Sequence, residues 1–158
     1  MEHRALLQGV AAAARAGDLA RALALTVEAL GADTGTLHFL GDDGHLHLGA
    51  TGGGIPPVVM DKIRVIPVGK GMAGLAVERS APVTACNIQT DASGDVRPGA
   101  RATGLEGAIC VPVLAGERAV GALGVANRAE RTFTDAEQAL LLAVGRELAA
   151  VRPGAAAR

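Results

Sequence analysis

The 158-residue sequence is almost without aromatic side chains: it contains two phenylalanines and neither tyrosine nor tryptophan. Proteins that hold nucleobases or flat ring systems usually stack them on such side chains, so this composition argues against binding by stacking. The formal net charge is −1 at pH 7, which offers no electrostatic attraction for nucleic acids or anionic membranes. We therefore expect neither a nucleic acid nor a membrane as a partner.

Cysteine is also scarce, because the chain has only Cys86 and Cys110. Two cysteines are too few for a fold held together by disulfides. The N-terminal segment lacks the apolar stretch of a secretion signal, and no hydrophobic run reaches the length of a membrane span. These absences predict a cytoplasmic protein with reduced thiols.

Apolar residues, by contrast, make up 49% of the chain and charged residues 20%, which is typical of one globular domain. The clearest structural signal lies at 107–126, where two runs rich in valine, isoleucine and leucine flank the short polar segment 115–118. Such a pair predicts an antiparallel β-hairpin. Both faces of this hairpin are mostly apolar, so we place it in the middle of a sheet.

Helical patterns are expected at both ends of the chain. Residues 3–16 and 18–30 carry apolar side chains at helical spacing, and Asp18 is positioned to cap the second helix. Near the C-terminus, Thr134 and Glu137 have the spacing of a capping box. They predict the start of a last helix with one apolar face.

Two strands are predicted at 36–40 and 45–49, joined by a four-residue turn at 41–44. This turn would place His38 opposite His47. The core-facing side chains of the hairpin would then be Leu37, Phe39, Leu46 and Leu48. Further along, the pattern predicts strands at 64–68 and 82–86, short helices near 56–62 and 72–78, and a polar segment over 87–104.

This order of elements predicts an α+β fold. We expect a central antiparallel sheet of five or six strands. The N- and C-terminal helices would cover one face, and the short helices and loops would cover the other. Residues 1–17 are expected to form a helical extension, 18–151 the domain itself and 152–158 a disordered tail.

Four stretches of the chain together resemble the GAF domain family: residues 66–77, 82–91, 110–128 and 133–137. The first looks like the family's glycine-punctuated turn into a pocket helix, and the third looks like its central hairpin. The resemblance covers about residues 18–151. It implies a profilin-like sheet of strand order 2-1-5-4-3 with a pocket under the central helices. It also implies a sensory role in signal transduction, in which a bound small molecule alters an output domain or protein.

A ligand in that pocket would need a mostly apolar lining with a few polar groups. Arg97 and Arg101 are the expected anchors for an anionic group, because a guanidinium binds anions with two parallel hydrogen bonds. The expected ligand-binding residues are Met72, Leu75, Cys86, Ile88, Asp91, Arg97, Arg101, Thr103 and Cys110, with Ile66, Leu105 and Ala108 as further apolar lining. The alternative is a solvated loop over a filled core, which would leave a pure dimerisation or protein-interaction module.

Some GAF domains reduce free methionine sulfoxide, and this resemblance offers an enzymatic alternative. Cys110 lies in an apolar strand and is expected to be inert, whereas Cys86 precedes a polar loop and is the better candidate for a reactive thiol. The cysteine pattern of those reductases is absent. We therefore expect a non-enzymatic protein that has no catalytic residues and no cofactor.

Other GAF domains bind cyclic nucleotides, and Asn127, Phe133 and Glu137 match part of their pattern. Arginine and glutamine replace the lysine and glutamate that the pattern requires beside two of these positions. A helix cap explains the same residues without a ligand. No aromatic side chain is placed to stack on a purine.

A metal site is a further alternative. With the predicted turn, His38, His45 and His47 would gather on one face of the hairpin, and imidazole is a common zinc ligand. No aspartate or cysteine is clearly arranged to complete such a site. Histidine is also an ordinary residue on a half-exposed strand.

The two end helices carry apolar stripes that must be buried. The sheet will cover part of each stripe, and the remainder would form a symmetric homodimer. The stripes consist of Leu19, Leu23, Val27 and Leu30 in one helix and Leu140, Val144, Leu148 and Val151 in the other. The alternative is a monomer whose end helices pack only on each other.

Overall fold

The computed structural model describes residues 2–153. Met1 and residues 154–158, which include most of the predicted tail, lie outside the described residues. In chain order the elements are α1 (Glu2–Arg15), α2 (Leu19–Ala29), β1 (Thr34–Leu40), β2 (His45–Thr51), α3 (Pro57–Ile63), β3 (Val65–Pro67), α4 (Gly71–Arg79), β4 (Val83–Ala85), the 3₁₀-helix η1 (Pro98–Thr103), β5 (Gly107–Ala115), β6 (Arg118–Asn127) and α5 (Asp135–Ala149). No helix in this described part is long and apolar enough to cross a membrane.

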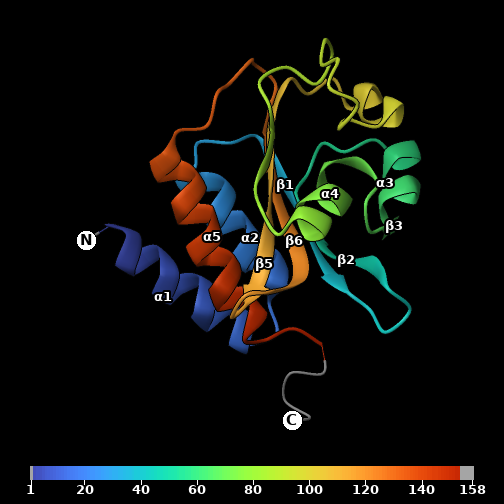
Figure 1. Cartoon of the computed structure of the whole chain (residues 1–158). Helices are drawn as coiled ribbons and strands as arrows, with labels where there is room; N and C mark the ends of the chain where they lie inside the picture. Colours follow the sequence, from blue (N-terminus) through green and yellow to red (C-terminus); the bar gives the residue numbers. More distant parts are fainter. Residues whose placement is uncertain (1, 154–158) are drawn as a thin grey trace.

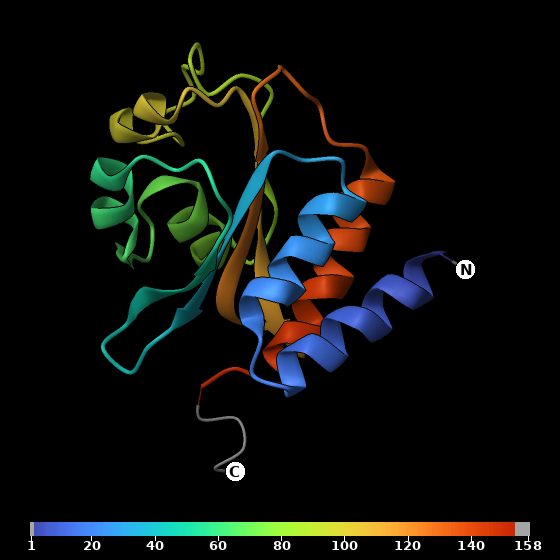
Figure 2. The same cartoon turned by 180° about the vertical axis from the view of Figure 1, so that it is seen from behind.

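The six strands form one antiparallel sheet in the order β3-β2-β1-β6-β5-β4. Helices α1, α2 and α5 cover one face, and α3, α4 and η1 lie on the other (Figures 1 and 2). The predicted α+β architecture is therefore confirmed. The resemblance implied five strands in the order 2-1-5-4-3, and the structure has this order with β3 added at the outer edge of β2.

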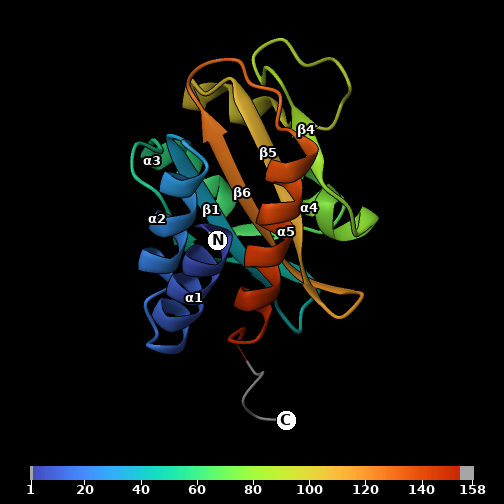
Figure 3. The same ribbon diagram turned by 90° about the vertical axis from the view of Figure 1, so that its left-hand side faces the viewer.

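The predicted hairpin at 107–126 lies at the centre of the sheet as β5 and β6. On the side of α1, α2 and α5, which Figure 3 views from the front, large aliphatic side chains fill the core. Side chains on this face that are fully buried include Leu37, Ile109, Val111, Val113, Leu123, Leu141, Val144 and Leu148. Burial of each such side chain stabilises the fold by roughly 1.5–3 kcal/mol, so this face supplies most of the stability.

Side-chain caps begin two of the helices as predicted. The carboxylate of Asp18 accepts a hydrogen bond from the backbone N–H of Arg21 at the start of α2. At the start of α5 the Thr134 hydroxyl accepts from the N–H of Glu137, and the Glu137 carboxylate accepts from the N–H of Thr134. Both caps fix where a terminal helix turns onto the sheet.

The predicted register of the first hairpin is wrong by one residue. Gly41 pairs with His45, so the loop has three residues and ends at Gly44, whose φ of +77° is the left-handed position of that loop type. His38 consequently lies opposite Leu48, and Phe39 lies opposite His47. Since a shift of one residue moves every side chain to the other face, Leu46 joins the cluster under α4 instead of packing with Leu37.

Candidate ligand-binding site

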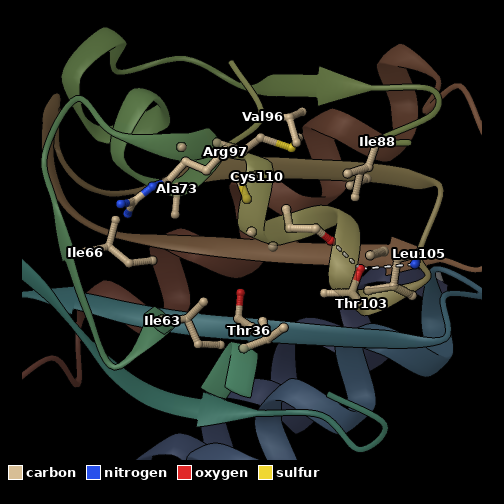
Figure 4. A pocket seen from close by; sticks show the side chains of 18 of the residues that line it. Thr36, Ile63, Ile66, Ala73, Ile88, Val96, Arg97, Thr103, Leu105 and Cys110 are labelled. Carbon is tan, nitrogen blue, oxygen red and sulfur yellow. Dashed lines mark hydrogen bonds between the residues drawn. The ribbon is translucent and has the colours of Figure 1, made fainter. Parts of the chain in front are cut away.

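A cavity of about 700 Å³ lies between the sheet and the layer formed by α3, α4 and η1 (Figure 4). Side chains from both layers project into it, among them Thr36 and Cys110 from the sheet and Ile63, Ile88 and Leu105 from the covering segments. Sites for small molecules are typically hollows of ~300–1,000 Å³. The cavity therefore has the size of a ligand site.

Small side chains on one face of β5 and β6 create the floor of this cavity. Ala108, Cys110, Gly124 and Ala126 line it, whereas the residues between them are large and fill the core on the other face. Gly124 lies between Thr36 of β1 and Cys110 of β5. A Cβ atom at Gly124 would lie only 2.9 Å from the Cys110 Sγ and 3.3 Å from the Thr36 Oγ1. The absence of a side chain at Gly124 therefore leaves space above this part of the sheet.

The walls of the cavity are aliphatic. None of the described residues that line it is aromatic, aspartate or glutamate. The wall side chains are Ile55, Val59, Ile63, Val65, Ile66, Met72, Ile88, Val96 and Leu105. Such walls favour an apolar ligand surface over a polar one.

Three cationic side chains stand among the lining residues: Lys62 on α3, Lys70 before α4 and Arg97 before η1. All three are exposed, and none forms an ion pair with a carboxylate in the described part of the chain. Arg97 lies across Gly71, where a Cβ atom would come within 2.9 Å of the Arg97 Cδ. Gly71, which has a φ of +67°, has no side chain that would collide with the aliphatic part of Arg97 at the rim.

A row of polar side chains, Thr34, Thr36 and His38, follows the cavity face of β1. Nε2 of the His38 ring lies 2.7 Å from the carbonyl oxygen of Ile63. Because a carbonyl only accepts, Nε2 carries the proton. Burial lowers the pKa of His38, so the ring is neutral at pH 7 and Nδ1 is a bare acceptor.

Two buried polar atoms in this row have no hydrogen-bond partner among the described residues: Nδ1 of His38 and Oγ1 of Thr34. The two residues are 1% and 5% exposed. Buried polar atoms are nearly always paired in folded proteins. Both atoms are enclosed by protein, so neither is accessible from the open cavity.

The structure brings five of the nine predicted ligand-binding residues together around the cavity. These are Met72, Ile88, Arg97, Thr103 and Cys110, and the further predicted lining of Ile66, Leu105 and Ala108 is present as well. The Thr103 hydroxyl is already engaged, since it donates to the carbonyl of Ala100 and accepts from the N–H of Leu105.

The other four predicted residues do not line the cavity: Leu75, Cys86, Asp91 and Arg101. Arg101, expected as an anion anchor, donates instead to the backbone oxygen of Asp91. The Asp91 carboxylate accepts from Ser93 within its own turn. These residues stabilise the polar loop before η1 and leave Arg97 as the arginine at the rim.

Sequence reasoning missed the hydroxyl and imidazole row on β1, the two lysines and the floor at Gly124 and Ala126. The alternation of small and large side chains along β5 and β6 was the available signal for the floor. Both sets are apolar, so a polarity pattern does not distinguish the two faces. Residue size at a period of two would have distinguished them.

The metal hypothesis for His38, His45 and His47 is contradicted by the hairpin register. His38 points into the protein on the cavity face, whereas both other imidazoles are on the surface and contact the Asp43 carboxylate or its backbone oxygen. The hydrogen bond from His47 holds the pKa of Asp43 below its usual value. No group of three potential metal ligands occurs in residues 2–153.

Of the two cysteines, one lies on β5 and the other just beyond the end of the neighbouring strand β4, and they are not paired across the sheet. Cys110 pairs with Val83, whereas Cys86 follows the end of β4 and is exposed. Burial raises the pKa of the Cys110 thiol to about 12. Its sulfur faces the cavity (Figure 4), where the protonated thiol acts as a small apolar surface.

The residues that resemble a cyclic-nucleotide pattern form a structural contact away from the cavity. Asn127 donates to the backbone oxygen of Gly31. Arg131 pairs with Glu137 and stacks over the Phe133 ring at 4.4 Å. None of these side chains lines the cavity, and together they join the end of β6 to α5.

The fold was compared with solved structures and curated proteins. A GAF domain from a phosphoenolpyruvate-protein phosphotransferase of Coxiella burnetii has 24% identity and a TM-score of 0.77, covering 98% of this chain and 95% of that one. A free methionine-R-sulfoxide reductase from Neisseria meningitidis, solved with its substrate, has 19% identity and a TM-score of 0.73, covering 95% and 90%. A domain assigned to a two-component sensor histidine kinase of Sinorhizobium meliloti has 17% identity and a TM-score of 0.66, covering 86% and 91%. No curated protein matched.

At these identities the structural likeness establishes the fold alone. The family assignment rests on the sequence itself, because the family model described as GAF domain matches residues 13–151. That match includes every strand and the elements that enclose the cavity. The chain therefore belongs to the GAF domain family.

Proposed function

We propose that this protein is a non-enzymatic sensory domain that binds a small molecule in the cavity under α3, α4 and η1. The observation that carries the proposal is the cavity of about 700 Å³ between the sheet and this layer, with small side chains on its floor and aliphatic side chains on its walls. A filled core would have close-packed side chains at this place. The open cavity favours a binding site over a pure interaction module.

The proposed signal would pass through the layers of the fold. The end helices and the layer of α3 and α4 lie on opposite faces of the same sheet (Figure 3), and the cavity lies under that layer. A ligand that draws α3, α4 and η1 onto the sheet would alter the packing of β1 and β6. These strands contact α2 and α5 directly, so a dimer through the end helices would pass the change to an output partner.

A free methionine sulfoxide reductase is the competing function, since some similar structures carry that activity. Two features argue against it. An amino-acid substrate carries an ammonium group, and no lining residue is acidic to pair with it. The one cysteine among the lining residues, Cys110, is held protonated by its raised pKa, whereas the thiolate is the nucleophile in thiol chemistry.

Native mass spectrometry of the purified protein, repeated after denaturation, tests the proposal first. It reports oligomeric state and any released small molecule together. A thermal-shift panel then compares the wild type with Ala126→Leu, which fills the floor, and with Ala139→Leu, a matched change on the exposed side of α5. We expect ligands that stabilise the wild type and Ala139→Leu but not Ala126→Leu.

The opposite results are equally informative. If no added mass is released and no compound distinguishes Ala126→Leu from the wild type, the cavity is not a ligand site. Turnover of free methionine sulfoxide that is lost in Cys86→Ser or Cys110→Ser would show the enzymatic alternative to be correct.

A further inference from the structure

The floor of the cavity offers one side-chain hydroxyl that is free to bind a ligand. Figure 4 shows the Thr36 hydroxyl projecting into the cavity, without a hydrogen bond to any residue drawn there. Thr36 is part-exposed, whereas the hydroxyl of Thr34, on the same face of β1, is enclosed by protein. The third lining threonine, Thr103, already uses its hydroxyl as donor and as acceptor. Of these three, only Thr36 can form a hydrogen bond with a bound molecule.

Thr36 borders an open part of the floor. It pairs with Gly124 of β6, which pairs in turn with Cys110 of β5. Because Gly124 has no side chain, the Thr36 hydroxyl and the Cys110 thiol lie on either side of a space over the backbone. A protonated thiol forms only weak hydrogen bonds. The hydroxyl of Thr36 is therefore the stronger hydrogen-bonding group beside this space.

The charged side chains among the lining residues are exposed to solvent. Because water surrounds Lys62, Lys70 and Arg97, an ion pair between a ligand and any one of them would add little affinity. The Glu78 carboxylate lies against Gly69 and places a negative charge beside Lys70. A charged group that reached the floor would lose its water without gaining an ion partner, which is costly. The part of a ligand that reaches the floor is therefore uncharged.

The lining and the free hydroxyl together define a class of ligand. The aliphatic walls favour an apolar body. A hydroxyl group both donates and accepts, so Thr36 can bind the oxygen of an alcohol or of a ketone. We infer that the ligand is an uncharged aliphatic alcohol or ketone whose oxygen forms a hydrogen bond with the Thr36 hydroxyl on the cavity floor. This inference rests on the proposed function and specifies the ligand class and the residue that selects it.

Eight-carbon probes test whether the bound molecule is uncharged. Met72 lines the cavity and Met60 on α3 does not, so octan-1-ol and octan-2-one should shift the methyl NMR signal of Met72 more than that of Met60. Calorimetry then compares affinities in the wild-type protein. Octanoate and octylammonium should bind about tenfold or more weakly than octan-1-ol, because their charged groups find no partner on the floor.

Thr36→Val tests the proposed contact, because valine keeps the shape of the side chain and removes the hydroxyl. It should weaken the binding of octan-1-ol about fivefold or more, as expected for the loss of a hydrogen bond. Thr34→Val is the matched control and should leave this affinity unchanged, since the Thr34 hydroxyl is enclosed and lies two residues away on the same strand. Valine is favourable in strands, so both variants should fold.

Any one of three results would overturn the inference. The first is that neither octan-1-ol nor octan-2-one shifts the Met72 signal. The second is that octanoate or octylammonium binds the wild type as tightly as octan-1-ol does, and the third is that Thr36→Val binds octan-1-ol as tightly as Thr34→Val does. If other compounds still stabilise the wild type but not Ala126→Leu in the thermal-shift panel, the proposed function survives with a different ligand class. If none does, both the function and the ligand class are wrong.

Discussion

Replacement of Thr34 by valine should stabilise the protein, although it removes a polar group from a strand. Thr34 is 5% exposed, and its Oγ1 has no hydrogen-bond partner among the described residues. The backbone at Gly52 covers the hydroxyl closely, since a Cβ atom there would lie 2.5 Å from it. An unpaired buried hydroxyl costs roughly 1–3 kcal/mol, and valine has nearly the same shape and a high β-propensity.

We therefore expect Thr34→Val to raise the free energy of unfolding by about 1–2 kcal/mol, which corresponds to roughly 2–8 °C in Tm for a domain of this size. Thr26→Val is the matched control. Thr26 is fully buried in α2, and its hydroxyl donates to the carbonyl of Ala22 at 2.9 Å. The same substitution there should lower stability by about 0.5–1 kcal/mol.

Urea unfolding followed by far-ultraviolet circular dichroism measures both effects, because the chain has no tryptophan or tyrosine to report by fluorescence. The m-value should stay constant in both variants, as it does when only stability changes. A decrease in stability for Thr34→Val, equal to that of Thr26→Val, would refute the reasoning. It would mean that a buried water already satisfies the Thr34 hydroxyl.

Three further predictions concern reactivity, pH and assembly. A thiol reagent at pH 8 should modify exposed Cys86 rapidly and Cys110 only slowly, because the raised pKa of Cys110, about 12, keeps its thiol protonated; equal rates would contradict this. The backbone N–H of Thr134 and the side chain of Arg131 hold the pKa of Glu137 below its usual 4.5. The stability that the Glu137 carboxylate contributes is therefore present above pH 4.5 and lost as the pH falls below it. Glu137→Gln should flatten the acid limb of a curve of unfolding free energy against pH. Light scattering should find a dimer. Leu7→Glu on α1 should dissociate it, whereas Val65→Glu at the exposed β3 edge should leave it intact. The reverse pattern would place the interface away from the end helices.

The fold was predictable because its strongest local signals agree with one another. The β5–β6 hairpin has an unmistakable apolar pattern, and the caps at Asp18 and Thr134 define two helix starts. The first hairpin was harder, since the segment 41–44 fits a three-residue and a four-residue loop equally well. The choice depends on which side chains the finished molecule buries, and that is decided by α4 and β3, far from the loop in sequence.

The site was predictable where its residues lie on regular elements or directly beside them. Met72 is in the first turn of α4, Cys110 is on β5, and Arg97 immediately precedes η1. The segment 87–104 has no periodicity that fixes which side chains turn inward. Arg97 and Arg101 therefore looked equivalent, although the finished loop points one to the rim and uses the other to hold its own backbone.

The contrast between the two faces of the sheet follows from side-chain size alone. Along β5 and β6 the large residues Ile109, Leu123 and Val125 face α1, α2 and α5 and are almost completely buried. The intervening small residues leave space between the sheet and the layer of α3, α4 and η1. Side chains such as Ile63 and Leu105 project from that layer towards the sheet and line this space (Figure 4). Close packing of both faces would have required large residues at both sets of positions. The cavity is thus specified by the sequence of the two strands, and a larger side chain at Gly124 or Ala126 should remove ligand binding while leaving the core on the other face intact.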